Sequence, residues 1–315
     1  TMATITTPAQ HSPAHDAEII RKACEGLGTD DRGLISIIGH RNSIQRRLIR
    51  EAYQQLYEED LIHRLEKEIS GDFERAVYRW MLDPADRDAV LAHVALKKTD
   101  PSYQVIVELA CVLSSEELLA VRRAYQSRYK YSLEEDVASH STGDVRMLLV
   151  GLVSSYRYEG AEFNSRLAKS EADILHKAIT KDKAFSHEEV IRILSTRGKL
   201  QLVATFNHYC QAYGITINKS LSAEHTNEYL GALGTAIRCI KDPKKYFEKV
   251  LRLALVKSGT DEDGLTRVVV TRAEKDLREI KELYFKRNSV TLEQAVAKET
   301  SGSYEAFLLT LLGKE

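Results

Sequence analysis

Apolar residues recur along the chain at the spacing of helix faces, and the pattern repeats four times. In each copy two apolar residues stand four positions apart, a short polar break follows, and a second such pair comes next. Because residues i and i+4 lie on one face of an α-helix, each pair predicts the buried face of a short helix. We therefore expect an all-α protein. The pairs are Leu61/Leu65, Leu133/Val137, Ile217/Leu221 and Leu292/Val296, then Phe73/Val77, Val145/Leu149, Tyr229/Leu233 and Tyr304/Leu308.

Two further positions keep the same register in the four copies. A tyrosine occurs in every copy, and 15 residues after it stands an acid in three copies and a histidine in the second. These residues are Tyr53/Glu68, Tyr125/His140, Tyr209/Glu224 and Tyr284/Glu299. The chain thus divides into four repeats, each too small to be stable alone, so we expect the repeats to pack on one another. The expected boundaries are a tail at 1–13, repeats at 14–84, 85–156, 168–243 and 244–315, and a linker at 157–167.

The first and fourth repeats share a glycine-containing turn. L-G-T-D-D-R-G-L (27–34) aligns with S-G-T-D-E-D-G-L (258–265), and K-E-I-S-G-D-F-E (67–74) aligns with K-E-T-S-G-S-Y-E (298–305). The threonines of these turns, Thr29 and Thr260, are predicted to be the N-caps of the helices that follow. Thr260 with Asp263 has the outline of a capping box.

In both repeats, 39 residues separate the threonine of the turn from a glutamate, Glu68 or Glu299. Glycine tolerates the positive φ angles that turn backbone carbonyls outward. Several carbonyl oxygens and one bidentate carboxylate suit calcium, which takes about 6–8 oxygen ligands. The equal spacing therefore indicates a cation site shared between the turn and the distant acid. A solvated surface acid would explain one copy, but it explains two copies with the same spacing less well.

Other loops that bind phosphate or metal are excluded by their patterns. Gly26-Leu27-Gly28 is not G-x-G-x-x-G and follows no strand, so a dinucleotide-binding loop is not indicated. The chain has neither G-x-x-x-x-G-K-[ST] nor the acidic loop of an EF-hand.

The composition is ordinary, but the net charge limits the partners that the protein can bind directly. The 315 residues are 29% charged and 43% hydrophobic, as in ordinary globular proteins, and the formal net charge is −1. We therefore expect no nucleic-acid partner, and contact with an acidic surface would need a mediator. No apolar run approaches the roughly 20 residues of a membrane span. The four cysteines are far apart in sequence, which favours free thiols in a reducing cytosol.

With its G-x-G-T-D turn, its acid 39 residues later within E-x-S-G-D-F, and its four repeats, the chain resembles the annexins over residues 14–314. Stretches such as I-I-G-H-R-N (37–42) and S-S-Y-R-Y-E-G (154–160) are similar to plant annexins in particular. The resemblance implies repeats of about five short helices packed into a curved disc. It also implies calcium-dependent binding of anionic phospholipid, by a cytoplasmic protein that becomes peripheral to membranes when calcium rises.

The resemblance also implies which residues hold calcium (Ca2+). In repeat 1 the ligands would be the carbonyls of Cys24, Gly26 and Gly28 and the carboxylate of Glu68. In repeat 4 they would be the carbonyls of Leu255, Lys257 and Gly259 and the carboxylate of Glu299. Because Lys257 replaces a glycine and brings a positive charge, we expect the repeat 4 site to be weaker.

Repeats 2 and 3 are expected to lack a site. In repeat 2 the segment 95–102 has no glycine and His140 replaces the acid, whereas repeat 3 keeps Glu224 but has I-T-K-D-K-A-F (179–185) as its loop. Plant relatives often carry tryptophan where this chain has Leu27 and Thr99. The protein is therefore expected to insert less aromatic surface into a membrane than those relatives.

Other functions suggested for plant annexins stay open as alternatives. His40 is a candidate for peroxidase-like activity and Cys111 with Cys239 for redox activity, although a turn histidine and buried thiols are the simpler interpretations. Ile191-Arg192-Ile193 resembles a tripeptide proposed to bind F-actin, but core packing explains both isoleucines. Nucleotide hydrolysis, channel activity and a calcium-independent helical scaffold are further alternatives that the sequence does not test.

Overall fold

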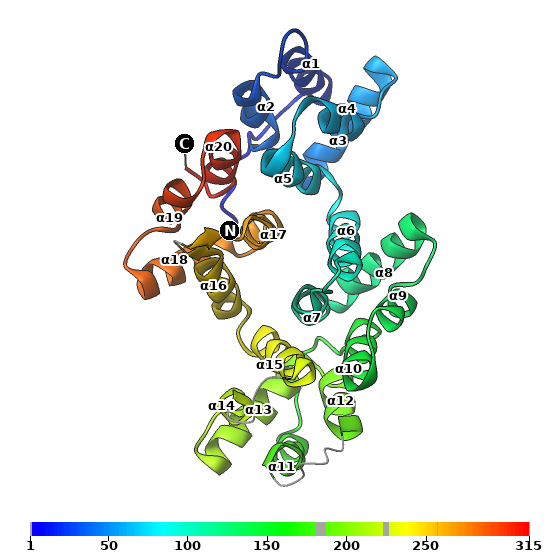
Figure 1. The fold of residues 1–315 in the computed structure, drawn as a ribbon, viewed down its shortest axis with the longest axis vertical. Helices are drawn as coiled ribbons and strands as arrows, with labels where there is room; N and C mark the ends of the chain where they lie inside the picture. The colour runs from blue at the N-terminus through cyan, green and yellow to red at the C-terminus, as the bar shows by residue number, and fades with distance from the viewer. Residues whose placement is uncertain (1, 181–186, 223–226, 257, 315) are drawn as a thin grey trace. The chain divides into compact units, whose positions relative to one another are not determined.

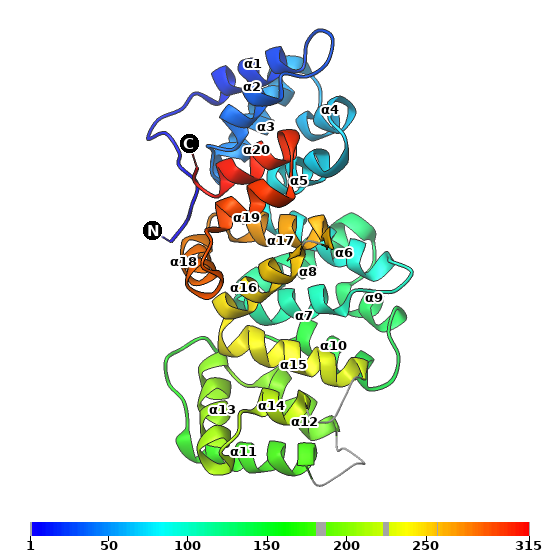
Figure 2. The same ribbon diagram turned by 60° about the vertical axis from the view of Figure 1, so that its left-hand side comes forward.

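The structure is a computed structural model that describes residues 2–180, 187–222, 227–256 and 258–314. Within these ranges it contains twenty α-helices and one two-stranded hairpin, five helices to a repeat (Figures 1 and 2). The all-α prediction, with about five short helices in each repeat, is confirmed. No helix in the described ranges is long and apolar enough to span a bilayer.

The helices of repeats 1 and 2 are α1 (Pro13–Ala23), α2 (Asp31–Ile38), α3 (Ser43–Tyr57), α4 (Leu61–Glu68), α5 (Gly71–Met81), α6 (Pro84–Lys97), α7 (Tyr103–Val112), α8 (Ser115–Tyr129), α9 (Leu133–Ser139) and α10 (Gly143–Val153). Those of repeats 3 and 4 are α11 (Ser165–Thr180), α12 (His187–Thr196), α13 (Lys199–Tyr213), α14 (Ile217–Ser222), α15 (Glu228–Lys241), α16 (Pro243–Ala254), α17 (Glu262–Arg272), α18 (Leu277–Asn288), α19 (Leu292–Glu299) and α20 (Gly302–Leu311). Strands β1 (Leu255–Val256) and β2 (Gly259–Thr260) lie between α16 and α17.

The chain forms two compact units that pair the repeats in an order the sequence does not reveal. The terminal unit joins the described residues up to 87 to those from 244 on, and the central unit comprises residues 88–243. In the terminal unit, α2 packs on α20, and α5 packs on α17 and α20. In the central unit, α7 packs on α15. Repeat 1 therefore shares its core with repeat 4, and repeat 2 shares its core with repeat 3.

The apolar positions that define the repeats form the core of each unit. All sixteen residues of the periodic pairs are buried, and so are the four register tyrosines. Burial of these side chains is the main stabilising contribution, because each removes apolar surface from water. Phe73 of repeat 1 meets Phe307 of repeat 4 edge to face, with ring centroids 5.9 Å apart.

Each third helix ends in the same way in all four repeats. The residue after the helix adopts a left-handed conformation, with φ between 51° and 68°. These residues are Glu58, Lys130, Gly214 and Ser289. A left-handed residue stops a helix and lets its N–H bond to a carbonyl of the last turn. Only repeat 3 uses glycine, the residue for which this conformation carries no steric penalty.

A buried arginine joins repeats 1 and 4. The Arg46 side chain is inaccessible to solvent, and its guanidinium lies 3.6 Å from the centroid of the Trp80 ring. Its Nη2 donates to Glu274 Oε2 at 3.1 Å, and its Nη1 donates to the Arg41 carbonyl at 2.8 Å. Burial lowers the pKa of Arg46 to about 10, although Glu274 opposes this shift. Glu274 is thus the counter-ion of a cation that has no access to water.

We expect Glu274→Ala to lower the free energy of unfolding of the terminal unit by about 3 kcal/mol, because removing one partner leaves a buried charge uncompensated. Trp80 is the only tryptophan in the chain, so its fluorescence during urea unfolding reports on this unit. Glu282→Ala, which removes an exposed acid of α18, should change stability by less than about 0.5 kcal/mol. Equal losses in the two variants would contradict the assignment.

A second buried pair gives the terminal unit a dependence on pH. Arg41 donates to both carboxylate oxygens of Asp16, from Nε at 2.8 Å and from Nη2 at 2.9 Å, and His11 Nδ1 lies 3.0 Å from Oδ2. Burial alone would raise the pKa of Asp16, but the hydrogen bonds from Arg41 and His11 outweigh burial and hold that pKa below its ordinary value. A carboxyl whose pKa is lower in the folded state stabilises the protein above its unfolded pKa of about 3.9.

We expect Asp16→Asn to destabilise the protein by about 2 kcal/mol at pH 7, because Arg41 loses its charged partner. The difference from wild type should begin to shrink as the pH falls below about 4, where Asp16 of the unfolded chain becomes protonated, and should disappear only below the lower pKa of Asp16 in the folded protein. Thermal unfolding followed by circular dichroism at pH 7, 5 and 3.5 measures both effects. Glu18→Gln on the exposed face of α1 is the control, and a pH-independent difference would contradict the linkage.

Candidate metal centre

The loop of repeat 1, residues 24–30, has an open glycine turn. Gly26 and Gly28 have φ angles of 94° and 81°, and no atom lies within 4 Å of where a Cβ would stand on either residue. Leu27 between them is fully exposed. The Asp30 N–H donates to the Ala23 carbonyl at 2.8 Å and closes the loop. The glycines therefore have the positive φ angles that the sequence predicts.

The predicted roles of the two threonines are wrong. Helices α2 and α17 are capped by Asp30 and Asp261, whose carboxylates accept the N–H groups of Gly33 at 3.0 Å and Gly264 at 3.1 Å. The capping box of Thr260 and Asp263 is therefore absent. An aspartate follows each threonine, and the charged carboxylate takes the capping position because it complements the helix dipole. This leaves each threonine hydroxyl free for another partner.

That partner is the acid 39 residues later. Thr29 Oγ1 lies 3.1 Å from the Glu68 carbonyl oxygen, to which it donates, and 3.3 Å from Oε2 of the same residue. In repeat 4, Thr260 donates to the Glu299 carbonyl at 3.3 Å. The turn and the acid are thus held together by the same hydrogen bond in both repeats.

The loop of repeat 4 differs from that of repeat 1. It is a short antiparallel hairpin in which Leu255 pairs with Thr260 and Val256 with Gly259, and Gly259 has a φ of 143°. Lys257 lies outside the described residues. The Asp261 N–H closes this loop on the Ala254 carbonyl at 2.9 Å, as Asp30 does in repeat 1. The all-helical pattern does not predict this hairpin, because two-residue strands are too short to show an alternation.

Both acids line one polar cavity of about 500 Å³ inside the terminal unit. Its carboxylates are those of Asp31, Glu68, Asp72, Glu262 and Glu299. Within the described ranges, no three acidic, histidine or cysteine side chains are placed to hold a metal ion. Since side chains alone do not form a site there, a cation would need backbone oxygens as well.

Arg64 is a neighbour of the site that the sequence analysis missed. Its Nη2 donates to the Cys24 carbonyl at 3.3 Å, and its Nε lies 2.9 Å from Glu68 Oε1. The signal that could have found it is the i, i+4 spacing of Arg64 and Glu68 within the predicted helix.

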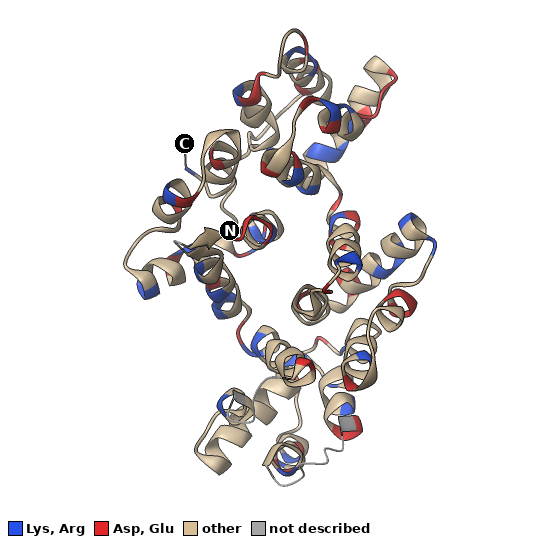
Figure 3. Ribbon diagram, in the orientation of Figure 1, with Lys and Arg blue, Asp and Glu red and all other residues tan. Residues whose placement is uncertain are grey.

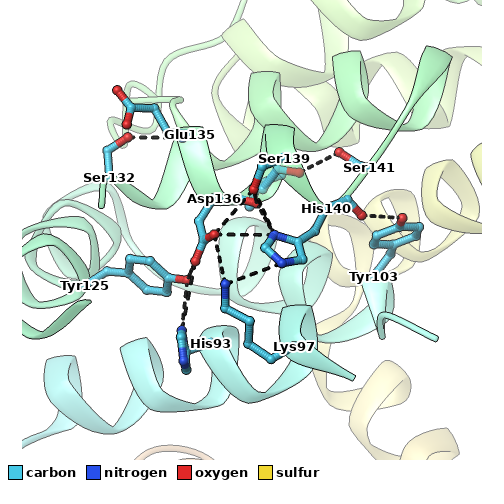
Figure 4. Close-up of polar contacts among 11 residues, drawn as sticks. His93, Lys97, Tyr103, Tyr125, Ser132, Glu135, Asp136, Ser139, His140 and Ser141 are labelled. Carbon is cyan, nitrogen blue, oxygen red and sulfur yellow. Dashed lines mark hydrogen bonds and ion pairs between the residues drawn. The ribbon is translucent and has the colours of Figure 1, made fainter. Parts of the chain in front are cut away.

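In repeat 2 a lysine lies beside the residues that correspond to Arg64 and Glu68, which are Asp136 and His140 (Figure 4). Lys97, at the end of α6, has its Nζ 3.3 Å from Asp136 Oδ1 and 3.4 Å from His140 Nε2. Burial would raise the pKa of Asp136, but hydrogen bonds from Tyr125 and Lys97 outweigh burial and hold that pKa below its ordinary value. Tyr103 donates to the His140 carbonyl at 2.8 Å. The cluster therefore already has a cation of its own. In repeat 3, Glu224 and most of the loop lie outside the described residues.

The residues considered for other activities make structural contacts or are buried in the core. His40 Nδ1 is 2.9 Å from the Thr6 carbonyl oxygen, so its ring contacts the N-terminal segment. Cys111 and Cys239 are buried free thiols, and burial raises the pKa of each, which disfavours the reactive thiolate. Ile191 and Ile193 are buried on α12, as core packing predicts. These surroundings favour a structural role for all five residues.

Comparison with known proteins places these features in a family. The annexin family model matches residues 15–80, 87–152, 170–233 and 246–311. The chain is 66% identical over 314 residues to annexin-like protein RJ4 of Fragaria ananassa, covering all of both chains. Its fold is similar to that of annexin III, with a TM-score of 0.95 at 32% identity over 99% of this chain and 97% of that one. It is also similar to a calcium-bound annexin (Sm)1, with a TM-score of 0.85 at 26% identity over 99% and 93% of the two chains.

We expect Thr29→Val to loosen the loop of repeat 1, because it removes the hydrogen bond to Glu68 and keeps the shape of the side chain. A loss of about 1 kcal/mol should speed exchange of the Asp30 amide about fivefold in hydrogen–deuterium exchange without metal. Thr260→Val is the matched control and should speed exchange of Asp261 while leaving Asp30 unchanged. If Asp30 exchanged at the wild-type rate in Thr29→Val, the hydroxyl would not hold the loop.

Proposed function

Because the chain belongs to the annexin family, we propose that it binds anionic phospholipid membranes through calcium ions held by repeats 1 and 4. One observation carries the proposal. In both repeats a threonine hydroxyl fastens the loop to a glutamate 39 residues later, so a carboxylate stands beside exposed backbone. The calcium-bound state of the similar annexin (Sm)1 supports the choice of metal.

The proposed ligands combine hard oxygen donors from the two segments. In repeat 1 they are the carbonyls of Cys24, Gly26 and Gly28 with the carboxylate of Glu68, and in repeat 4 the carbonyls of Leu255, Lys257 and Gly259 with the carboxylate of Glu299. Four protein donors leave positions for water and for a lipid oxygen, since calcium takes about 6–8. Glu68 and Glu299 are each only partly buried, so solvent and a headgroup can approach them.

The charge distribution supports dependence on calcium. Basic and acidic residues are interspersed along the helices of each unit (Figure 3), and the net charge is −1. The cavity beside the loops carries five carboxylates, which repel an anionic surface. Bound calcium supplies the positive charge that lets a phosphate or carboxylate headgroup approach. Docking by a basic surface patch, which needs no calcium, is not supported by this distribution.

Leu27 is the proposed membrane contact of repeat 1. It is fully exposed at the tip of the glycine turn, between Gly26 and Gly28, and no atom lies within 4 Å of where a Cβ would stand on either glycine. Burying a leucine in the interface adds roughly 1.5–3 kcal/mol of apolar stabilisation. The protein would then be peripheral to the cytoplasmic face of membranes and would bind reversibly.

We expect the protein to sediment with phosphatidylserine vesicles in calcium and to be released by a chelator. Glu68→Ala and Glu299→Ala should each raise the calcium concentration needed for half-maximal sedimentation, because each removes the only charged ligand of one site. The double variant should need at least about tenfold more calcium than wild type, which corresponds to about 1.4 kcal/mol.

Glu66→Ala is the matched control for these variants. It removes an exposed acid two residues before Glu68 in the same helix, and sedimentation should stay as in wild type. If the double variant sedimented at the wild-type calcium concentration, the assignment of both sites would be wrong.

A further inference from the structure

The side chain of Arg64 lies among the oxygens proposed to bind calcium in repeat 1. It comes one turn before Glu68 in α4, and its Nε is 2.9 Å from Glu68 Oε1. Its Nη2 donates to the carbonyl of Cys24, 40 residues away, at 3.3 Å. One guanidinium thus contacts the acid and the first loop carbonyl of the same proposed site.

We propose that Arg64 is a displaceable cation that competes with calcium at repeat 1 and so sets the calcium concentration at which that site fills. The inference rests on the proposed function. Calcium bound by the Cys24 carbonyl and the Glu68 carboxylate would need the two oxygens that the guanidinium contacts, and the two cations repel each other. The side chain must therefore swing away before the ion can bind.

A second carboxylate lies within reach of the displaced arginine. Arg64 Nη1 is 3.7 Å from Glu59 Oε2, which already accepts a hydrogen bond from Arg21 at 2.8 Å. The Arg64 side chain is 23% exposed and is not locked in the core. The guanidinium can leave Glu68 and pair with Glu59 instead, so it keeps an ionic partner when calcium takes its place at Glu68.

The other repeats provide natural comparisons at the same register. In repeat 4 the position of Arg64 is taken by Ala295, which offers no charge to the Glu299 carboxylate. In repeat 2 the position is Asp136, which holds the ammonium of Lys97. Repeat 1 therefore combines a glycine turn and acid, as in repeat 4, with a basic side chain held by a carboxylate of the fourth helix, as in repeat 2. The effect of Arg64 opposes that expected from Lys257, so the two sites are closer in affinity than the loops alone suggest.

The test isolates the repeat 1 site by using Glu299→Ala as the background. Binding of radioactive calcium to the full chain is measured with vesicles of phosphatidylserine and phosphatidylcholine, alongside sedimentation. Adding Arg64→Ala should lower the half-saturating calcium concentration about tenfold. In the Glu68→Ala background, where only repeat 4 remains, Arg64→Ala should change nothing. The reverse variant, Ala295→Arg in that background, should raise the half-saturating concentration.

Lys67→Ala is the matched control, because it removes an exposed positive charge beside Glu68 without touching the loop. It should shift half-saturation less than about twofold. Equal shifts in Lys67→Ala and Arg64→Ala, or weaker calcium binding in Arg64→Ala, would overturn the inference. Arg64→Gln tests the same point if the alanine variant folds poorly by circular dichroism. The proposed function itself fails if wild type and every variant bind no calcium, which is a different result.

Discussion

Each candidate site depends on one hydrogen bond, which a side-chain hydroxyl donates to the backbone carbonyl at the end of the fourth helix of the repeat. Thr29 and Thr260 donate to Glu68 and Glu299, and in repeat 2 Tyr103 donates to His140. The carbonyls at the end of a helix have no partner within it, so a hydroxyl from the start of the second helix of the repeat, or from just before it, satisfies one of them. The start of the second helix and the end of the fourth helix are thereby joined whether a glutamate or a histidine stands at the acid position. The chemistry of the site can change while the scaffold stays the same.

Charge is handled differently in the core and at the loops. In the core, Arg41 meets the fixed carboxylate of Asp16 with two-point geometry. Such pairs offset the cost of removing both ions from water only when the geometry is good. At the loops, Arg64 has a choice of partners and remains partly solvated. Arginine therefore fixes the structure in the core, whereas at the loop of repeat 1 it can change its carboxylate partner.

Helical periodicity and the 39-residue spacing predicted the repeats and the approach of each turn to its acid. Helical periodicity is local and the 39-residue spacing occurs twice, so both can be recognised in a single sequence. The pairing of repeat 1 with repeat 4 was not predictable, because it is made by contacts between residues far apart in the sequence, such as Phe73 with Phe307 and Arg46 with Glu274. The caps were misassigned because threonine and aspartate are both good capping residues and stand next to each other. Arg64 was missed because no other repeat carries it.

The left-handed residues that end the third helices keep the protein below the stability that its fold could reach. For a residue with a Cβ, this conformation costs roughly 1–2 kcal/mol, and repeats 1, 2 and 4 carry that cost with Glu58, Lys130 and Ser289. Natural proteins are rarely at their stability optimum, because selection removes only variants that fall below a threshold. Glycine at these three positions would create a reserve against which the loops could acquire destabilising mutations. The helix ends thus limit how much destabilisation the loops can tolerate.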